Sequence, residues 1–381
     1  LDITVQSPSD ARHHFPHIDV GCDSQATADA IDDLRHGWRK GMRVSWPPEG
    51  AFNRLFMDIA LSPEFWRTLP QVTAVTGLCL RRQTTRRWNT GAVRELVKHL
   101  SGLQELHYEP WREWDIRRRT VTDTNTRALL ESLRHTAREL TRVVLFEDFS
   151  EAYTHSFVVF SPYGIPQSRS AEQVRTPSRD LTMELAMTGA RLRRLEHLSA
   201  AFLVDAKDFF PVVQRAGTGS WNKLTSLTLT SLLLAPARHS GPTINNLLEQ
   251  AALAAARLPA LNSMEVWNGR KALACVFRYQ APPLLSLPTS SSVDQHLQAA
   301  SARLTWRATW FLAIEPRVVE AWRTVACKRR PSCDLQVVHD ILGAAIRVSI
   351  TSHGDAIRHL DFSHDVLRPV SLSQIQRENL C

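Results

Sequence analysis

Aromatic residues and carboxylates alternate in HYEPWREWDIRRRT, residues 107–120. The aromatic residues are Tyr108, Trp111 and Trp114, and the carboxylates are Glu109, Glu113 and Asp115. Two carboxylates about 5 Å apart would suit a retaining glycosidase, but all three here come from one short segment. We instead expect a loop that packs over the end of a sheet, with Trp111 and Trp114 as an apolar plug and Arg112 paired with a carboxylate. A partner-binding edge is the alternative interpretation.

A second stretch that could do chemistry is RRQTTRRW, residues 81–88, which combines four arginines with Trp88. Arginines interleaved with aromatic residues can hold phosphates and stack bases, so this stretch and Arg117–Arg119 could form a basic rim. The simpler interpretation is that these arginines pair with the acidic 109–115 segment or are solvated, and we favour it.

Histidines cluster in HHFPH, with His13, His14 and His17, and in SHGDAIRHLDFSHD, residues 352–365. A metal site needs three or four ligands that converge on one point, and neither run repeats a known ligand spacing. We expect a turn at Gly354 followed by a short helix. The sequence also has no GxxxxGK[ST] loop, GxGxxG fingerprint or GxSxG elbow, so we expect no metal, no cofactor and no catalytic residue.

One pattern recurs along the chain: an apolar residue, two others, an apolar residue, one other, and an apolar residue. The central positions of its six copies are Leu78, Leu106, Val143, Leu198, Leu227 and Met264. The copies are 28 to 55 residues apart, whereas tandem leucine-rich repeats keep about 20–29. Helix-like segments precede several copies, at 90–100, 124–138 and 243–258. Helix, short turn and L-x-x-L-x-L strand form the unit of a leucine-rich repeat.

The predicted fold class is therefore α/β, a degenerate leucine-rich-repeat-like solenoid of parallel strands backed by helices, with loop insertions. We expect one domain over residues 1–381. Residues 161–180 and 281–302 are rich in Ser and Pro, and we expect both to be mobile loop insertions. The tail continues the α/β pattern, with a strand at 304–314 and a helix opened by Pro316. Cys79 lies in a strand-like run and Cys275 in a helix-like one.

The two-residue period of a strand assigns side chains to faces. Leu227 and Leu229 should point toward the helices, and Ser226, Thr228 and Thr230 toward the opposite, open face. We expect that open face and the strand-end loops to bind a protein partner, unless insertions cover the face. The partner-binding residues that we predict are Arg81, Arg82, Trp88, Glu109, Trp111, Trp114, Phe146 and Trp267.

The chain of 381 residues is 43% hydrophobic and 22% charged, which is ordinary globular composition. Its net charge of +8 is compatible with an acidic partner but does not require one. No apolar run approaches the roughly 18 residues that span a bilayer, and no secretory signal is visible, so we expect no membrane partner. The six cysteines are dispersed, without a CxxC pair, which favours reduced thiols in the cytoplasm or nucleus.

Several phrases together resemble one known family. They are LPQVTAVTGLCLRRQTTRRW (69–88), LQELHYEPWREWD (103–115), RVVLFEDF (142–149), LEHLSAAFLVDAKDFF (195–210), MEVWNGRKALACVFRYQ (264–280), TWRATW (305–310) and SHGDAIRHL (352–360). These phrases resemble recurring blocks of fungal F-box-like proteins that carry a large, uncharacterised, leucine-rich-repeat-like C-terminal domain. The resemblance covers roughly residues 1–375. The family's F-box-like segment lies upstream of such a domain and is absent here; the start at Leu1 leads us to expect residues upstream.

The resemblance implies an adaptor, in which the upstream segment docks on a ubiquitin-ligase scaffold and the repeat-like domain selects a target protein. Our first hypothesis is a non-enzymatic protein-interaction domain of this kind. The alternative is nucleic-acid or polyanion binding through the arginine-rich rim, which we favour less. Neither hypothesis identifies the target.

Overall fold

The computed structural model describes residues 1–5, 12–13, 15, 18, 32–45, 48–82, 86–113, 116–149, 159–160, 166–167, 176–217, 219–235, 240–282, 301–331 and 333–378. The predicted insertions at 161–180 and 281–302 lie largely outside these residues. At the end of the first one, Arg179 and Asp180 already belong to a helix.

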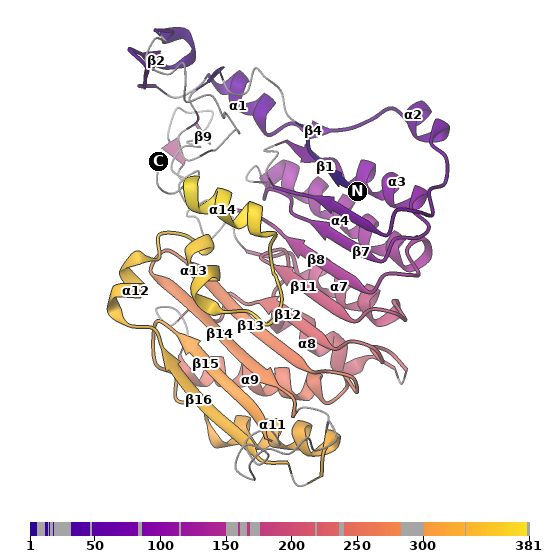
Figure 1. Cartoon of the computed structure of the whole chain (residues 1–381), viewed down its shortest axis with the longest axis vertical. Helices are drawn as coiled ribbons and strands as arrows, with labels where there is room; N and C mark the ends of the chain where they lie inside the picture. Colours follow the sequence, from indigo (N-terminus) through magenta and orange to yellow (C-terminus); the bar gives the residue numbers. More distant parts are fainter. Residues whose placement is uncertain are drawn as a thin grey trace, which may run out of the picture.

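Ten strands of the described chain form one sheet, in the order β1-β5-β7-β8-β11-β12-β13-β14-β15-β16 (Figure 1). The strands are β1 Asp2–Ile3, β5 Gly77–Leu80, β7 Glu105–Tyr108, β8 Arg142–Phe146, β11 His197–Ala201, β12 Ser226–Thr230, β13 Ser263–Arg270, β14 Leu273–Gln280, β15 Ala302–Ala308 and β16 Leu335–Ile341. Each strand pairs in parallel with the next except around β14, which is antiparallel to both neighbours. The spatial order of the strands therefore follows the chain.

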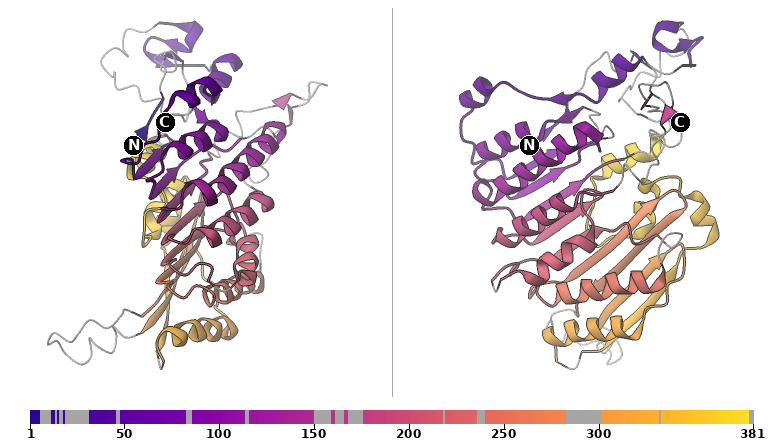
Figure 2. Two further views of the ribbon diagram at one scale, coloured as in Figure 1. Left: turned by 90° about the vertical axis from the view of Figure 1, so that its right-hand side faces the viewer. Right: turned by 180° about the vertical axis from the view of Figure 1, so that it is seen from behind.

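One layer of helices covers one face of this sheet (Figure 2). These helices are α3 Thr90–His99, α4 Ile116–Thr136, α7 Arg179–Arg191, α8 Ala206–Arg215, α9 Gly241–Ala255 and α11 Pro316–Arg329. Side chains cap several of them: Asn89 accepts from the Gly91 N–H, and Ser178 from the Leu181 N–H. Pro316 occupies the first turn of α11, as predicted.

The C-terminal segment returns across the opposite face of the sheet. Its helices are α12 Ala344–Ser349, α13 His353–Leu360 and α14 Pro369–Glu378, drawn in orange and yellow in Figure 1. Ser352 and Asp355 form a capping box that starts α13. A hydrophobic core separate from the one under the helix layer lies beneath these helices and includes Phe146, Trp267 and Leu360.

The remaining described elements are small and lie outside the main sheet. They are η3 Leu34–His36, β2 Trp38–Arg39, β3 Met42–Arg43, α1 Glu49–Leu55, β4 Asp58–Ile59, α2 Pro63–Thr68, β6 Arg87–Trp88, β9 Val159–Phe160 and β10 Pro166–Gln167. β4 pairs with β6 in parallel, so the segment around α1 and α2 lies beside the start of α3.

All six copies of the apolar pattern are strands, namely β5, β7, β8, β11, β12 and β13. Leu227 and Leu229 belong to the core on the helix side, so the predicted register is confirmed. The prediction that the other face is open is wrong for Thr228, Thr230 and Trp267, which are buried. The cause is the C-terminal segment, and not an insertion, since α12–α14 pack there.

Smaller predictions also need correction. Cys275 lies in strand β14 and not in a helix, because β14 is buried on both faces and its apolar run carries no two-residue alternation. The helix expected from residue 124 begins at Ile116 and takes in Arg117–Arg119. The strand expected at 304–314 covers only Ala302–Ala308, and Gly354 lies inside α13 and not in a turn before it.

Candidate functional site

Five of the predicted partner-binding side chains are buried. They are Arg82, Glu109, Trp111, Phe146 and Trp267. Arg81 is half-buried and paired with Asp2 at 2.7 Å, and Trp88 is half-buried in β6. Trp114 lies outside the described residues. Partner binding stays a prediction for this set, but the premise that the five side chains are exposed is wrong. The C-terminal segment covers Arg82, Glu109, Phe146 and Trp267, and Phe56 packs on Trp111.

Arg82 is the centre of a buried group of charges where β5, β7 and β8 end. Its side chain is 1% exposed. Its guanidinium donates to Asp148 and, at 2.7 Å, to Glu378 Oε2 in α14, and it lies 4.4 Å over the Trp111 ring. We call Arg82, Glu109, Asp148, His353 and Glu378 the strand-end cluster. Each charge of this cluster has an opposite charge or a hydrogen-bond donor beside it, as burial requires.

Asp148 joins the sheet to α13. Its Oδ1 lies 2.8 Å from His353 Nε2, and its other oxygen accepts from Arg82. Burial by itself raises the pKa of Asp148, but the Arg82 charge and the His353 hydrogen bond outweigh burial and lower this pKa to about 2. Asp148 is therefore ionised throughout the physiological range.

Glu109 joins the sheet to α14. Its carboxylate accepts from the Ser371 hydroxyl at 2.6 Å, from the Arg368 N–H at 2.9 Å and from the Arg82 N–H at 3.2 Å. Burial raises the pKa of Glu109, and these hydrogen bonds only partly offset the increase. Glu109 is thus occupied by donors from this chain, and not available to a substrate in this arrangement.

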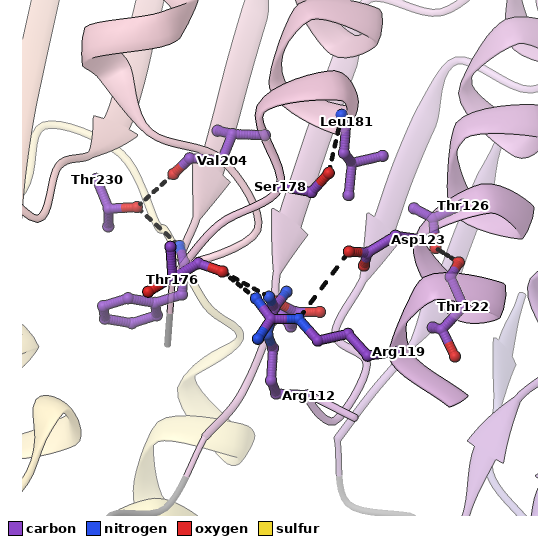
Figure 3. Close-up of polar contacts among 12 residues, drawn as sticks. Arg112, Arg119, Thr122, Asp123, Thr126, Thr176, Ser178, Leu181, Val204 and Thr230 are labelled. Atoms are coloured by element: carbon purple, nitrogen blue, oxygen red, sulfur yellow. Dashed lines mark hydrogen bonds and ion pairs between the residues drawn. The ribbon is translucent and has the colours of Figure 1, made fainter. Parts of the chain in front are cut away.

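Glu147 forms a separate buried pair with Arg112 at the end of β8. Arg112 also donates to the Thr176 carbonyl at 2.8 Å, and Arg119 of α4 donates to the same oxygen (Figure 3). Burial raises the pKa of Glu147 to about 7, although Arg112 opposes the rise. The pKa of the neighbouring Asp123 is also raised by burial.

The interpretation of residues 109–113 as a packed loop is confirmed. Trp111 packs against Phe56 with ring centroids 5.5 Å apart, and Arg87 donates to Glu113 at 2.8 Å. The cavity bordered by Tyr108 and Glu147 measures about 10 Å³, which is enough for at most one water. The cavity beside these strand ends is thus too small for a substrate in this arrangement.

A cavity of about 640 Å³ lies at β6. We call it the β6 cavity; its lining residues are Arg54, Phe56, Met57, Asp58, Arg87, Trp88, Asn89, Thr90, Val121, Thr122 and Asn125. A second cavity of about 590 Å³ adjoins it at Asn89 and is bordered by Leu61 and Trp66. These sizes are typical of ligand or side-chain binding sites.

Two features of the β6 cavity bear on what it can hold. Met57 and Val121 at its rim are 53% and 60% exposed, so part of its mouth is apolar, beside the exposed Arg54. The buried Trp88 Nε1 has no hydrogen-bond acceptor among the described residues. Arg87 is not free to bind an anion, because it is paired with Asp58 at 2.6 Å and with Glu113 at 2.8 Å. Burial alone would lower the pKa of Arg87, but the two carboxylates outweigh burial and raise this pKa.

The sequence interpretation found Trp88 but missed Met57, Val121, Glu378 and the role of His353. Met57 and Val121 carried no signal, because isolated apolar residues are common on surfaces. His353 was considered only as a metal ligand. Within the described residues, no group of three or more His, Cys, Asp or Glu side chains could hold a metal ion. None of the helices there combines the length and apolar character needed to cross a bilayer.

Residues 134–368 match the model of a family of unknown function, DUF6546. This match covers more than half of the chain, from the end of α4 to the loop before α14, and the chain belongs to that family. A search of curated proteins finds no match.

Proposed function

We propose that this chain is a non-enzymatic protein-interaction domain that binds a partner protein at the β6 cavity. The observation that carries the proposal is the apolar rim of that cavity, where Met57 and Val121 are more than half exposed beside Trp88. An aromatic wall with an apolar mouth is the arrangement in which a partner's aliphatic or aromatic side chain is buried at an interface.

The strand ends support the non-enzymatic part of the proposal. Catalytic carboxylates need a reacting group within about 3 Å, and the Glu109 and Glu147 carboxylates are occupied by donors from this chain. A cavity of about 10 Å³ beside Glu147 leaves no room for a substrate in this arrangement.

A finer form of the proposal is that the fold is a degenerate leucine-rich-repeat-like solenoid. Its support is the strand order, in which β5, β7, β8, β11, β12 and β13 follow one another in parallel with their helices on one side. Solenoids of this kind present extended binding surfaces. The irregular repeat length and the antiparallel β14 depart from a regular repeat array.

The most specific form of the proposal is that the chain is the target-recognition part of an F-box-type ubiquitin-ligase adaptor. That form rests on the sequence resemblance alone, and the scaffold would bind a segment outside this chain. The alternative of a nucleic-acid or polyanion rim loses support at Arg82 and Arg87, since both are buried and paired with carboxylates.

The first test places a charge at the rim of the β6 cavity. Met57→Glu and Val121→Glu change exposed side chains, so we expect both variants to fold and to lose the proteins that co-purify with the chain. Leu253→Glu is the matched control, because Leu253 is 46% exposed on the outer side of α9, toward the other end of the helix layer. Equal loss in all three variants, or equal retention, would contradict binding at the β6 cavity.

The adaptor form needs its own test. Full-length protein from the native host and this 381-residue chain are purified side by side, and bound proteins are identified by mass spectrometry. We expect ligase scaffold proteins only with the full-length protein, and one set of partners with both. If neither preparation retains scaffold proteins, the adaptor form fails while binding at the β6 cavity can still hold.

A further inference from the structure

Four buried polar atoms without a hydrogen-bond partner among the described residues gather at one place on the sheet. They are His107 Nδ1, Arg142 Nε, His197 Nδ1 and Ser199 Oγ. His107 is 3% exposed and Ser199 is 8% exposed. A buried polar atom without a partner costs roughly 1–3 kcal/mol, so four together need an explanation.

The strand register makes these four residues neighbours. Arg142 pairs with His197 across β8 and β11, while His107 and Ser199 flank Val144 from either side. All four side chains lie on the face opposite the helix layer, on the adjacent strands β7, β8 and β11. We call them the sheet-face cluster.

Two basic residues of the C-terminal segment, His364 and Arg368, lie beside the cluster. His364 packs against His197, with ring centroids 4.7 Å apart. Burial and the charges of Arg368 and Arg142 together lower the pKa of His107 to about 4. The pKa of His197 is likewise lowered by burial, by His364 and by Arg142. The two histidines are therefore held in their neutral forms near pH 7, beside the positive charges of Arg142 and Arg368.

The other buried arginines differ from Arg142. Arg82, Arg112 and Arg278 each have a carboxylate partner in the interior. Arg142 has no ion pair within the described residues, although Glu105 and Glu196, both exposed, lie at the rim of the cluster. Arg142 and His197 are half-buried, so the cluster opens to solvent.

We propose that the sheet-face cluster binds a phosphate group, carried by a phosphorylated amino acid or by a nucleotide. An anion would accept from the unpartnered donors and offset the charges of Arg142 and Arg368. Arg142, the two histidines, Ser199 and Arg368 offer more donors than the two oxygens of a carboxylate can use, whereas a phosphate monoester presents three terminal oxygens and up to two negative charges. This site is separate from the β6 cavity and does not depend on the function proposed for it.

Phosphate binding has a consequence for the histidines. A dianion beside them favours their charged forms, so the pKa values of His107 and His197 should rise when phosphate is bound. The other titratable groups around them are Cys79 on β5, Glu105 on β7, Glu196 before β11, and His364 and Arg368 above the sheet.

The experiment titrates the full 381-residue chain with inorganic phosphate, phosphoserine and adenosine monophosphate, and follows the imidazole signals by NMR. Sodium acetate and sodium chloride at matched ionic strength are the reference anions. We expect saturable shifts with phosphate compounds and a higher pKa for His197 in the saturated protein. Tighter binding of phosphoserine or of the nucleotide than of inorganic phosphate would identify what carries the group.

Variants locate the site. Arg142→Gln and Ser199→Ala each remove a donor to a charged group, and we expect each to weaken binding by about tenfold or more. Arg303→Gln is the matched control, because Arg303 is an exposed arginine of the same face on the distant strand β15. The proposal is overturned if no phosphate compound gives saturable shifts, if acetate binds as well as phosphate, or if Arg303→Gln weakens binding as much as Arg142→Gln.

Discussion

At the scale of single residues, the chain buries charges in matched sets. Arg82 with Asp148 and Glu378, and Arg278 with Glu265, lie on the sheet face or at the strand ends that the C-terminal segment covers. Removing one member of such a set leaves an unpaired buried charge, which costs more than the pair itself contributes. These pairs therefore specify where α13 and α14 dock more than they add stability.

Glu147 gives the residue-scale prediction. Its folded-state pKa of about 7 lies above its ordinary value, so between these two values the folded protein binds more protons than the unfolded chain. The stabilisation from protonated Glu147 is thus present at low pH and is lost as the pH rises toward 7 and above. Relative to Glu147→Gln, the wild type should lose unfolding free energy across this window by at most about 1.4 kcal/mol per pH unit.

The measurement is denaturant unfolding of both proteins at several pH values between 5 and 8. A constant difference between them is the cost of leaving Arg112 without its carboxylate, and only the change of that difference with pH reports the proton. Parallel curves for wild type and Glu147→Gln would show that Glu147 titrates well below pH 7.

The sequence could identify the residue types of the strand-end cluster but not their burial. Arg82, Glu109 and Trp111 stand out because charged and aromatic residues follow apolar strands, and such positions lie at a sheet's carboxyl edge. The cover of Arg82 and Glu109 comes from Glu378 and Ser371, more than 250 positions further along the chain, while Phe56 packs on Trp111. No local pattern encodes a contact over that separation, so the expectation that Arg82 and Glu109 are exposed to a partner is wrong, even though the packed loop at 109–113 is confirmed.

At the scale of elements, the apolar pattern predicted six strands. Its last two apolar residues are two positions apart, which places both side chains on the same, buried face of a strand. The pattern did not predict that α13 and α14 pack on the sheet, because their packing depends on close backbone approach as well as on apolar side chains. Gly269 in β13 shows this: a Cβ built there would lie 2.6 Å from the Ala356 Cβ of α13. The close approach of this helix to the strand requires a residue without a side chain.

Gly269→Ala should therefore push α13 away from β13 and lower the free energy of unfolding by about 1–3 kcal/mol. Gly343→Ala is the control, because a Cβ at Gly343 meets no atom within 4 Å and its φ of −63° suits alanine. We expect that change to stay within about 1 kcal/mol in either direction. The measurements are the denaturant midpoints of Gly269→Ala and Gly343→Ala and the binding of a dye to exposed apolar surface. Equal midpoints and equal dye binding in the two variants would mean that α13 does not pack closely on β13.

At the scale of the whole molecule, one apolar core runs from Leu78 in β5 to Leu335 in β16. A row of repeats that contact only their neighbours can unfold in parts. Here the C-terminal segment joins distant strands: α14 pairs with Arg82 after β5, while α13 packs on β13 and β14. This link should couple the first strands of the sheet to the last ones.

We therefore predict a single cooperative unfolding transition. Leu106→Ala in β7 and Leu304→Ala in β15 remove fully buried side chains near opposite ends of the sheet, and each should lower the unfolding free energy by about 2–5 kcal/mol. Within each variant, far-UV circular dichroism and tryptophan fluorescence should report the same unfolding midpoint. The control Leu253→Ala, at an exposed position, should leave the wild-type midpoint nearly unchanged. If Leu106→Ala instead separates the two probes into distinct transitions, the strands before β8 unfold independently and the C-terminal segment does not couple the two ends.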